Sequence, residues 1–245
     1  MIERFEASLH PPRRQGGGEG GGPVILQVLP RLGTGGAERG TVDVAQAIVA
    51  AGGTAIVASE GGALERELAR AGAHHVTLPL ASKNPLVMRR NVGRLESLIE
   101  EHEVDILHAR SRAPAWSAAA AARRKGCHFV TTFHGTYNAS LPFKLRYNAI
   151  MVSGERVIAI SEFIARHIHE TYAVEPARIR VIQRGVDLAR FDPAKVSAER
   201  VIQLARAWRL PDGVPLIMLP GRLTRWKGQL LLLDALASLA ELDFR

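Results

Sequence analysis

Hydrophobic residues recur along the chain in short runs that alternate with longer stretches at helical spacing. Short apolar runs bounded by turn residues are typical of buried strands. The stretches between them repeat their apolar residues at the interval of a helix that packs one face on a core. The pattern predicts strands at residues 24–29, 54–59, 76–80, 104–108, 129–133, 156–160 and 179–183.

The stretches between these runs predict helices. Ser161 precedes the helical pattern of 162–171 and can accept a hydrogen bond from its first turn. Repeated strand–helix alternation indicates an α/β fold with a Rossmann-like, doubly wound parallel sheet. Ligands of such sheets bind beyond the carboxyl ends of the strands, so the loops after the strands are the places to search. The other predicted helices cover 35–51, 64–71, 86–101 and 113–122.

Glycine and turn residues divide the chain into three parts. Residues 1–23 contain a run of glycines whose ordering entropy nothing offsets, so we expect a flexible tail. Residues 24–210 hold the alternating elements and form the first domain. A turn-rich stretch then opens a second unit at residues 211–245, where too few elements remain to bury their own faces, so we expect a truncated second Rossmann-like domain. Its predicted elements are a strand at 214–219, a loop at 221–227 and a helix at 228–239.

The composition narrows the class of protein. Hydrophobic residues make up 47% of the chain and aromatic residues only 5%, which suits a buried parallel sheet. No apolar stretch reaches the length of about 18 residues that a transmembrane helix needs. The single cysteine, Cys127, excludes an intrachain disulfide and favours a reducing compartment, so we expect a cytoplasmic protein.

The charge of the chain favours anionic partners. The net charge is +8, which suits nucleotide diphosphates, nucleic acid or an anionic membrane face. The basic residues are spread along the chain without the aromatic interleaving of single-strand binding, so we expect no nucleic-acid partner. Peripheral contact with the inner face of a membrane stays compatible with this charge, and a generally basic solvated surface is an equally good interpretation.

A glycine-rich turn follows the first predicted strand. The segment Gly33-Thr34-Gly35-Gly36-Ala37-Glu38 leads into a helix. Gly35 and Gly36 let the backbone approach a ligand, and the helix N-terminus favours a negative group. The dinucleotide fingerprint fails, because Glu38 stands where its third glycine belongs. The turn alone is explained equally well as a flexible connection.

Two histidines lie where neighbouring strands are predicted to end. His108 is followed by Arg110, and His134 is followed by Gly135. A histidine at this edge can donate to a sugar hydroxyl or hold a phosphate. We favour a buried, satisfied side chain for His108 and a functional one for His134, because a glycine opens the backbone beside it.

A third segment combines glycines and cations. Gly221 and Gly228 flank a loop that carries Arg222 and Lys227, just before the last predicted helix. A guanidinium fork and an ammonium both suit a diphosphate whose charge grows as it leaves. An exposed basic turn is the alternative interpretation.

Together these segments resemble glycosyltransferase family 4, from about residue 24 to about residue 239. The match rests on the order and spacing of the Gly-Gly-Ala-Glu turn, the strand-end histidines and four further segments. These are Ile160-Ser161-Glu162, Ile182-Gln183-Arg184-Gly185-Val186-Asp187, Gly221-Arg222-Leu223 and Trp226-Lys227-Gly228. The resemblance implies the GT-B arrangement of two facing Rossmann-like domains.

The resemblance also implies roles for these residues. Gly35 and Gly36 would lie beside the diphosphate and sugar of the donor, and Arg222 and Lys227 would bind its phosphates. His134 would line the sugar pocket as the candidate catalytic residue. The acceptor-side candidates are His108 and Arg110.

Two positions depart from the family pattern, and one element is missing. Arg184 replaces the usual asparagine, and His108-Ala109-Arg110 replaces a His-x-His segment. The family's Glu-x7-Glu element, which holds the donor sugar, would fall beyond Arg245. We therefore expect the chain as written not to turn over.

The resemblance implies transfer of a sugar, with retention, from a nucleotide-diphosphate sugar to a glycan or lipid-linked acceptor. Cell-surface polysaccharide, lipopolysaccharide or glycolipid synthesis is the expected setting. Such enzymes need no cofactor, and the chain carries no Asp-x-Asp metal motif. Two alternatives stay open: a non-catalytic fragment or binding module of such an enzyme, and a nucleotide-dependent oxidoreductase, which the failed fingerprint disfavours.

Overall fold

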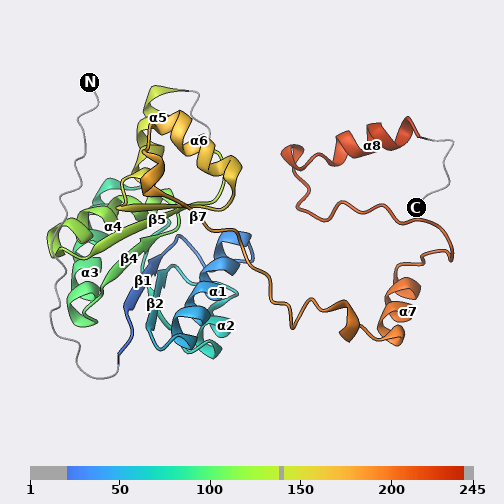
Figure 1. Ribbon diagram of the computed structural model, residues 1–245, viewed down its shortest axis with the longest axis horizontal. Coiled ribbons are helices and arrows are strands. Elements are labelled where there is room, and N and C mark those ends of the chain that lie inside the picture. Colours follow the sequence, from blue (N-terminus) through green and yellow to red (C-terminus); the bar gives the residue numbers. More distant parts are fainter. Residues whose placement is uncertain (1–20, 138–140, 240–245) are drawn as a thin grey trace. The chain divides into compact units, whose positions relative to one another are not determined.

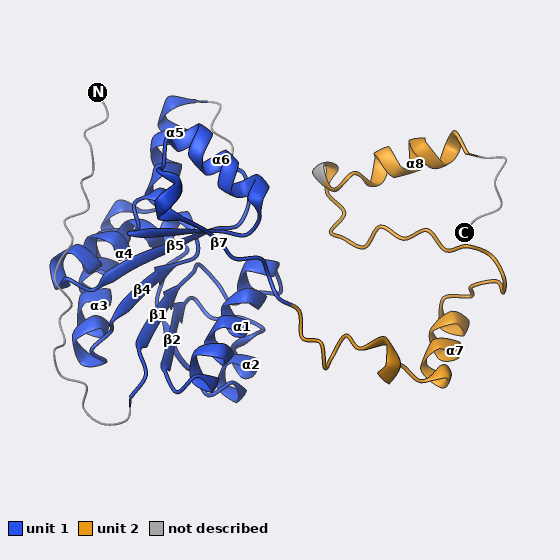
Figure 2. Cartoon of the chain, viewed as in Figure 1, with its two compact units in different colours: residues 1–185 blue, residues 186–245 orange. Residues whose placement is uncertain are grey.

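The computed structural model describes residues 21–137 and 141–239, without the side chain of Trp226 (Figure 1). The chain forms two compact units, residues 1–185 and 186–245, which we call unit 1 and unit 2 (Figure 2). Unit 1 ends before the domain boundary predicted near residue 210, and that boundary stays a prediction.

Most of the predicted tail lies outside the described residues, but Gly22 near its end contacts Gly52. Gly22 donates a backbone hydrogen bond to the carbonyl of Gly52 at 3.0 Å. A Cβ atom on Gly22 would come within 2.7 Å of that carbonyl oxygen, so only glycine fits this contact without a shift. Gly22 is thus held by a backbone contact, and the flexible tail over residues 1–23 stays a prediction.

Unit 1 contains parallel strands β1 (Val24–Val28), β2 (Thr54–Ser59), β3 (His74–Thr77), β4 (Ile106–Ala109), β5 (His128–Phe133), β6 (Arg156–Ala159) and β7 (Ile179–Val181). They form one seven-stranded sheet in the order β3-β2-β1-β4-β5-β6-β7. The chain moves outward to one side after β1 and to the other side after β4. This reversal confirms the predicted doubly wound α/β class.

Helices cover both faces of this sheet (Figure 1). They are α1 (Gly36–Ala50), α2 (Glu65–Arg70), α3 (Pro85–Glu101), α4 (Arg112–Lys125), α5 (Pro142–Asn148) and α6 (Glu162–Tyr172), with short 3-10 turns η1 (Ala149–Val152) and η2 (Pro176–Arg178). One apolar cluster joins α1 and α2 to the sheet. A larger cluster joins α3, α4, η1 and α6 to the sheet, so an apolar core lies on each face of the sheet.

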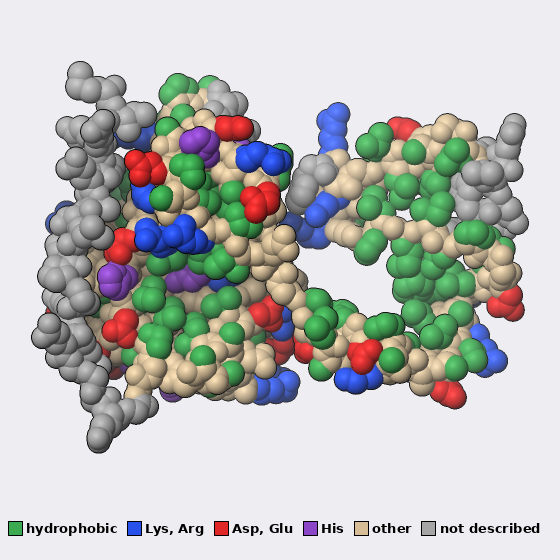
Figure 3. All heavy atoms as spheres, viewed as in Figure 1, with side chains coloured by type: hydrophobic (Ala, Val, Ile, Leu, Met, Phe, Trp, Pro, Cys, Tyr) green, Lys and Arg blue, Asp and Glu red, His purple; other side chains and the backbone are tan. Residues whose placement is uncertain are grey.

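Unit 2 contains α7 (Ala198–Ala207), α8 (Gln229–Ala237) and the 3-10 turns η3 (Pro193–Lys195) and η4 (Arg225–Lys227). The prediction of a helix at 228–239 is confirmed in α8. The strand predicted at 214–219 is wrong, because the described residues of unit 2 provide no neighbouring strand to pair with its backbone. Figure 3 shows hydrophobic side chains on the surface of this unit, and Leu231 is 72% exposed.

Two helices were not predicted, although each has a local start signal. Pro142 stands in the first turn of α5, where a missing N–H costs nothing. Ser197 caps α7 by accepting from the backbone N–H of Arg200 at 3.4 Å. Within the described residues, no helix combines the length and the apolar content needed to cross a bilayer.

Candidate functional site

The predicted site residues of unit 1 come together at one edge of the sheet. Gly35 and Gly36 follow β1, Arg110 follows β4, and His134 follows β5. β1 and β4 are paired, and the chain leaves them toward opposite sides. This is the switch point at which doubly wound sheets bind their ligands.

The glycine turn brings a cation onto the start of α1. Gly35 is the N-cap, and no side chain caps this helix, so its positive end can favour a negative group. A Cβ atom on Gly36 would collide with Nη1 of Arg184. Glycine at this position thus allows the guanidinium of Arg184, which follows β7, to lie directly against the turn.

His134 is held by the same arginine. Nη2 of Arg184 lies 3.0 Å from Nδ1 of His134, and because a guanidinium only donates, we assign Nδ1 as the acceptor. The proton of the neutral ring then sits on Nε2, which is buried and has no hydrogen-bond partner among the described residues. His134 therefore presents one unsatisfied N–H donor, which calls for an acceptor atom.

The charge state of His134 follows from its surroundings. Burial, with the nearby positive charges of Arg110 and Arg184, lowers the pKa of His134 to about 3. The ring is therefore neutral at physiological pH, since its ordinary pKa is about 6.5. A neutral ring donates a hydrogen bond but does not supply a proton as an acid, so His134 is suited to orienting an oxygen atom that accepts this hydrogen bond.

Arg110 is a second cation at this edge, and it is only 6% exposed. Its Nη1 donates to Oε1 of Gln27 at 3.1 Å, and Nε2 of Gln27 donates to the carbonyl of Thr41 at 3.1 Å. Burial and the charge of Arg184 lower the pKa of Arg110 to about 10, against the opposing effect of Asp43. Arg110 stays charged at neutral pH, and its Nε has no hydrogen-bond partner among the described residues.

His108 is enclosed beneath these residues. It is 6% exposed, and its Nε2 lies 2.7 Å from Oγ1 of Thr132. Burial lowers the pKa of His108 well below its ordinary value, and the charges of Arg110 and His134 act in the same direction. The buried, satisfied side chain favoured from the sequence is confirmed, while the acceptor-side role of His108 stays a prediction.

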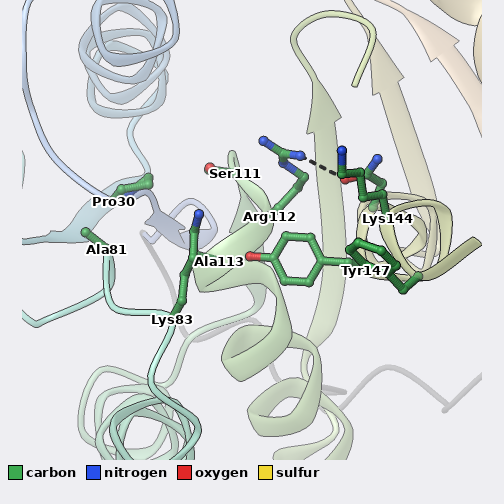
Figure 4. A pocket seen from close by; sticks show the side chains of 10 residues that line it. Pro30, Ala81, Lys83, Ser111, Arg112, Ala113, Lys144 and Tyr147 are labelled. Carbon is green, nitrogen blue, oxygen red and sulfur yellow. Dashed lines mark hydrogen bonds between the residues drawn. The ribbon is translucent and has the colours of Figure 1, made fainter. Parts of the chain in front are cut away.

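An open pocket of about 810 Å³ adjoins this edge (Figure 4). It is lined by Pro30 after β1 and by Ser111 and Arg112 at the start of α4, together with residues of α5 such as Tyr147. Neither Arg112 nor Tyr147 was identified from the sequence, because nothing in their local pattern marks a pocket. The helix α5 that carries Tyr147 was itself missed.

The remaining predicted residues lie in unit 2. Arg222 and Lys227 are both exposed. The side-chain amide of Gln229 donates through Nε2 to the carbonyl of Arg222 at 2.9 Å. Gly228 begins α8 with φ of +81°, a conformation that glycine adopts without strain. The phosphate-binding role of Arg222 and Lys227 and their place relative to His134 stay predictions.

Metal ligands do not gather in the part of the chain that the structure describes. No group of three or more His, Cys, Asp or Glu side chains there is arranged to hold a metal ion. The chemistry of the unit 1 edge instead comes from two guanidinium groups and one neutral imidazole. Such a set can bind an anionic group and orient an uncharged oxygen beside it.

Comparison with known proteins identifies the family of this chain. Glycosyltransferase Family 4 matches residues 34–190. The D-inositol 3-phosphate glycosyltransferase of Nocardiopsis dassonvillei is 33% identical over 162 residues, which cover 61% of this chain and 37% of that enzyme. The corresponding enzyme of Salinispora arenicola is 32% identical over 95 residues, which cover 38% of this chain and 21% of that enzyme.

Solved structures support the same assignment. A glycosyltransferase from Rickettsia africae shares 42% sequence identity and a TM-score of 0.80, covering 91% of this chain and 59% of that chain. Anabaena HepE, solved with UDP and glucose, has a TM-score of 0.70 over 87% of this chain and 57% of its own. Its 20% identity shows the fold alone, which is of the GT-B type. Because the family match spans the glycine turn, both strand-end histidines and Arg184, the chain belongs to glycosyltransferase family 4.

Proposed function

We propose that this chain carries the acceptor-side domain of a retaining glycosyltransferase that uses a nucleotide-diphosphate sugar. Gly35 and Gly36 would lie beside the diphosphate and sugar of the donor, and His134 would orient the sugar. Arg222 and Lys227 would bind the donor phosphates from the second domain. The acceptor would be a glycan or a lipid-linked molecule, and no cofactor or metal would be needed.

One observation carries this proposal: the buried Nε2–H of His134 has no partner among the described residues, and two guanidinium groups stand beside it. A nucleotide-diphosphate sugar offers both kinds of complement, since its phosphates are anionic and its sugar oxygens accept hydrogen bonds. Positive charge fixed before the reaction also stabilises the diphosphate as it leaves. The site thus suits a sugar donor better than a neutral ligand.

The relatives support the donor class and the setting. HepE was solved in complex with UDP-glucose, and the Nocardiopsis enzyme is named for D-inositol 3-phosphate. We propose a uridine-type sugar nucleotide as the first donor to test. We also propose a cytoplasmic enzyme of surface-polysaccharide or glycolipid synthesis, with peripheral contact to an anionic membrane through its basic surface.

The test is binding of UDP-glucose to the 245-residue chain by isothermal titration calorimetry. Arg184→Gln and His134→Ala each remove one contact and should weaken binding about tenfold, the scale of one charge-assisted or fully buried hydrogen bond. Arg180→Gln on β7 is the matched control, because its exposed guanidinium donates to the carbonyls of Ala177 and Ile179. Equal affinities in all four proteins would overturn the assignment of this edge to the donor.

A further inference from the structure

A polar cluster lies where β2, β3 and α2 meet, apart from the residues of the site described above. Ser59 ends β2, His75 lies in the edge strand β3, and Glu65 begins α2. Nε2 of His75 lies 2.8 Å from Oγ of Ser59, and its Nδ1 lies 3.7 Å from Oε2 of Glu65. Ser59 is fully buried, and the side chain of His75 is only 13% exposed. Burial of polar groups costs free energy, so this cluster calls for an explanation in the contacts that it makes.

The cluster contains the residue types of a hydrolytic triad, but its geometry does not fit one. A nucleophile must be open to its substrate, whereas Ser59 is fully buried. The distance of 3.7 Å between His75 and Glu65 is also too long for the hydrogen bond that orients a catalytic histidine. Oγ of Ser59 instead accepts a hydrogen bond from the backbone N–H of Gly61 at 3.0 Å. The serine therefore holds the chain rather than attacking a substrate.

The hydrogen bonds of the cluster define the tautomer of His75. Oγ of Ser59 accepts from Gly61, so we assign its hydroxyl proton to a hydrogen bond donated to Nε2 of His75. The ring proton then lies on Nδ1, on the side of the Glu65 carboxylate. Burial lowers the pKa of His75, against the opposing charge of Glu65, so the ring is neutral at physiological pH. Oε1 of Glu65 in turn accepts from the backbone N–H of Gly62.

The two glycines that the cluster holds have backbone conformations that other residues rarely adopt. Gly61 has φ of +85° and Gly62 has φ of +151°. A Cβ atom on Gly61 would collide with Oε1 of Glu65, and one on Gly62 would collide with the backbone carbonyl of Leu32. Glycine at these positions thus lets the loop after β2 pack closely on the cluster at one side and on the loop after β1 at the other.

The loop after β2, residues 60–64, in turn supports the start of the glycine turn. The N–H of Leu32 donates to the carbonyl of Gly61 at 2.9 Å, and the N–H of Leu64 donates to the carbonyl of Leu32 at 3.1 Å. Both backbone groups of Leu32 are therefore bonded to this loop. Leu32 is fully buried and directly precedes Gly33, where the glycine turn begins. A continuous set of hydrogen bonds thus joins the polar cluster to the glycine turn.

We propose that Ser59, His75 and Glu65 are positioning residues, which hold the loop at 60–64 so that the glycine turn keeps the conformation that receives the donor. The inference rests on the proposed function, because it takes the donor's diphosphate to lie beside the glycine turn. The cluster acts through backbone hydrogen bonds and would touch neither donor nor acceptor. Binding sites depend on such supporting contacts, since a small displacement of the groups that contact a ligand weakens its binding.

The experiment compares variants of the 245-residue chain by amide hydrogen exchange, followed by nuclear magnetic resonance. His75→Leu removes the acceptor of the Ser59 hydroxyl, whereas His75→Gln restores an acceptor on a neutral side chain. Val76→Ala is the matched control, because Val76 lies in the same strand but packs against the larger apolar cluster on the other face of the sheet. Ser59→Ala removes the same contact from β2 and gives the answer if His75→Leu does not fold.

The amide of Leu32 should exchange about tenfold faster in His75→Leu and in Ser59→Ala, the scale of one lost buried hydrogen bond, because the loop that holds this amide loosens. The amide of Leu107 in the central strand β4 is the reference for opening of the whole unit. Relative to Leu107, exchange at Leu32 should stay unchanged in Val76→Ala and return close to that of the unaltered chain in His75→Gln. Equal relative exchange at Leu32 in His75→Leu and Val76→Ala would overturn the inference.

Calorimetry with UDP-glucose separates this inference from the proposed function. Donor binding should weaken about threefold or more in His75→Leu and Ser59→Ala and should recover in His75→Gln. If Arg184→Gln and His134→Ala weaken donor binding but His75→Leu and Ser59→Ala do not, the donor assignment stands and the positioning inference fails. If the Leu32 amide loosens as expected while Arg184→Gln and His134→Ala leave donor binding unchanged, the donor assignment alone fails, and the cluster still positions the glycine turn.

Discussion

Arginine side chains have different surroundings in the two units of the chain. In unit 1, Arg110 is 6% exposed and fixed by Gln27, and Arg184 is held against His134. In unit 2, Arg222 is exposed in a loop that follows no strand of the described residues. The difference shows that a sheet, rather than the local sequence, turns a cation into a preorganised group. Charge in unit 1 is arranged before a ligand arrives, which is what electrostatic catalysis requires.

The apolar residues of the two units differ in the same way. Leu107 on β4 is fully buried, whereas Leu231 on α8 is 72% exposed. Both are leucines in apolar segments, so only the surrounding elements distinguish them. Single substitutions should therefore affect unit 1 far more than unit 2, and the following predictions test that contrast.

The largest effect should come from shortening these two leucines. Leu107→Ala leaves a cavity at the centre of the sheet and should lower the free energy of unfolding by about 2–5 kcal/mol. Leu231→Ala removes side-chain atoms that are already in water and should change it by less than about 0.5 kcal/mol. Urea unfolding followed by circular dichroism measures both. A comparable loss in the two variants would contradict the contrast between the units.

Much of unit 1 could be predicted from the sequence. The alternation of apolar runs located all seven strands of the sheet, because each buried strand leaves a short run bounded by turns. The position of His134 at a strand end followed from the same pattern. Periodicity acts locally, so the strand order, which depends on tertiary packing, could not be read from it.

The contacts of the site were less predictable. In the sequence, Arg184 stands out only as a departure from the family pattern. In the structure, its guanidinium contacts both the glycine turn and His134. Nothing in the sequence places it there, because the contact depends on the path of the chain after β7. In unit 2, the apolar residues at 214–219 have the pattern of a strand, but a strand forms only beside a partner.

The second prediction concerns the stability of the chain at acidic pH. The pKa of His134 is about 3 in the folded chain and about 6.5 when unfolded. Below about pH 6.5, His134 takes up a proton in the unfolded chain but not in the folded chain. The free energy of unfolding therefore decreases as the pH is lowered from about 6.5 to about 3. Between about pH 7 and about pH 5 this group should account for about 2 kcal/mol. Urea unfolding at the two pH values measures the loss.

A variant pair isolates this effect. His134→Gln should reduce the loss of stability on acidification, because glutamine does not titrate. His74→Gln, at an exposed position on β3, is the control and should keep the dependence of the unaltered chain. His108 acts in the same direction as His134, since its pKa is also lowered by burial, so part of the loss should remain. Identical pH dependence in both variants would contradict the buried, neutral state of His134.

A small effect on stability is expected from the glycines that lie beside cations in the two units. A Cβ atom on Gly36 would collide with the guanidinium of Arg184, which can move aside, so Gly36→Ala should change stability by less than about 1 kcal/mol. At Gly221 the nearest atoms lie 3.7 Å and 3.9 Å away, so Gly221→Ala meets only ordinary contacts. Urea unfolding of the two variants beside the unaltered chain measures these small changes.

The same two variants should nevertheless differ in the pKa of His134. Moving Arg184 away removes a positive charge that lowers the pKa of His134, so Gly36→Ala should raise that pKa and Gly221→Ala should not. A pH titration of the His134 ring protons by nuclear magnetic resonance decides this. An unchanged pKa in Gly36→Ala, or an equal rise in Gly221→Ala, would show that Arg184 is not fixed by the glycine turn.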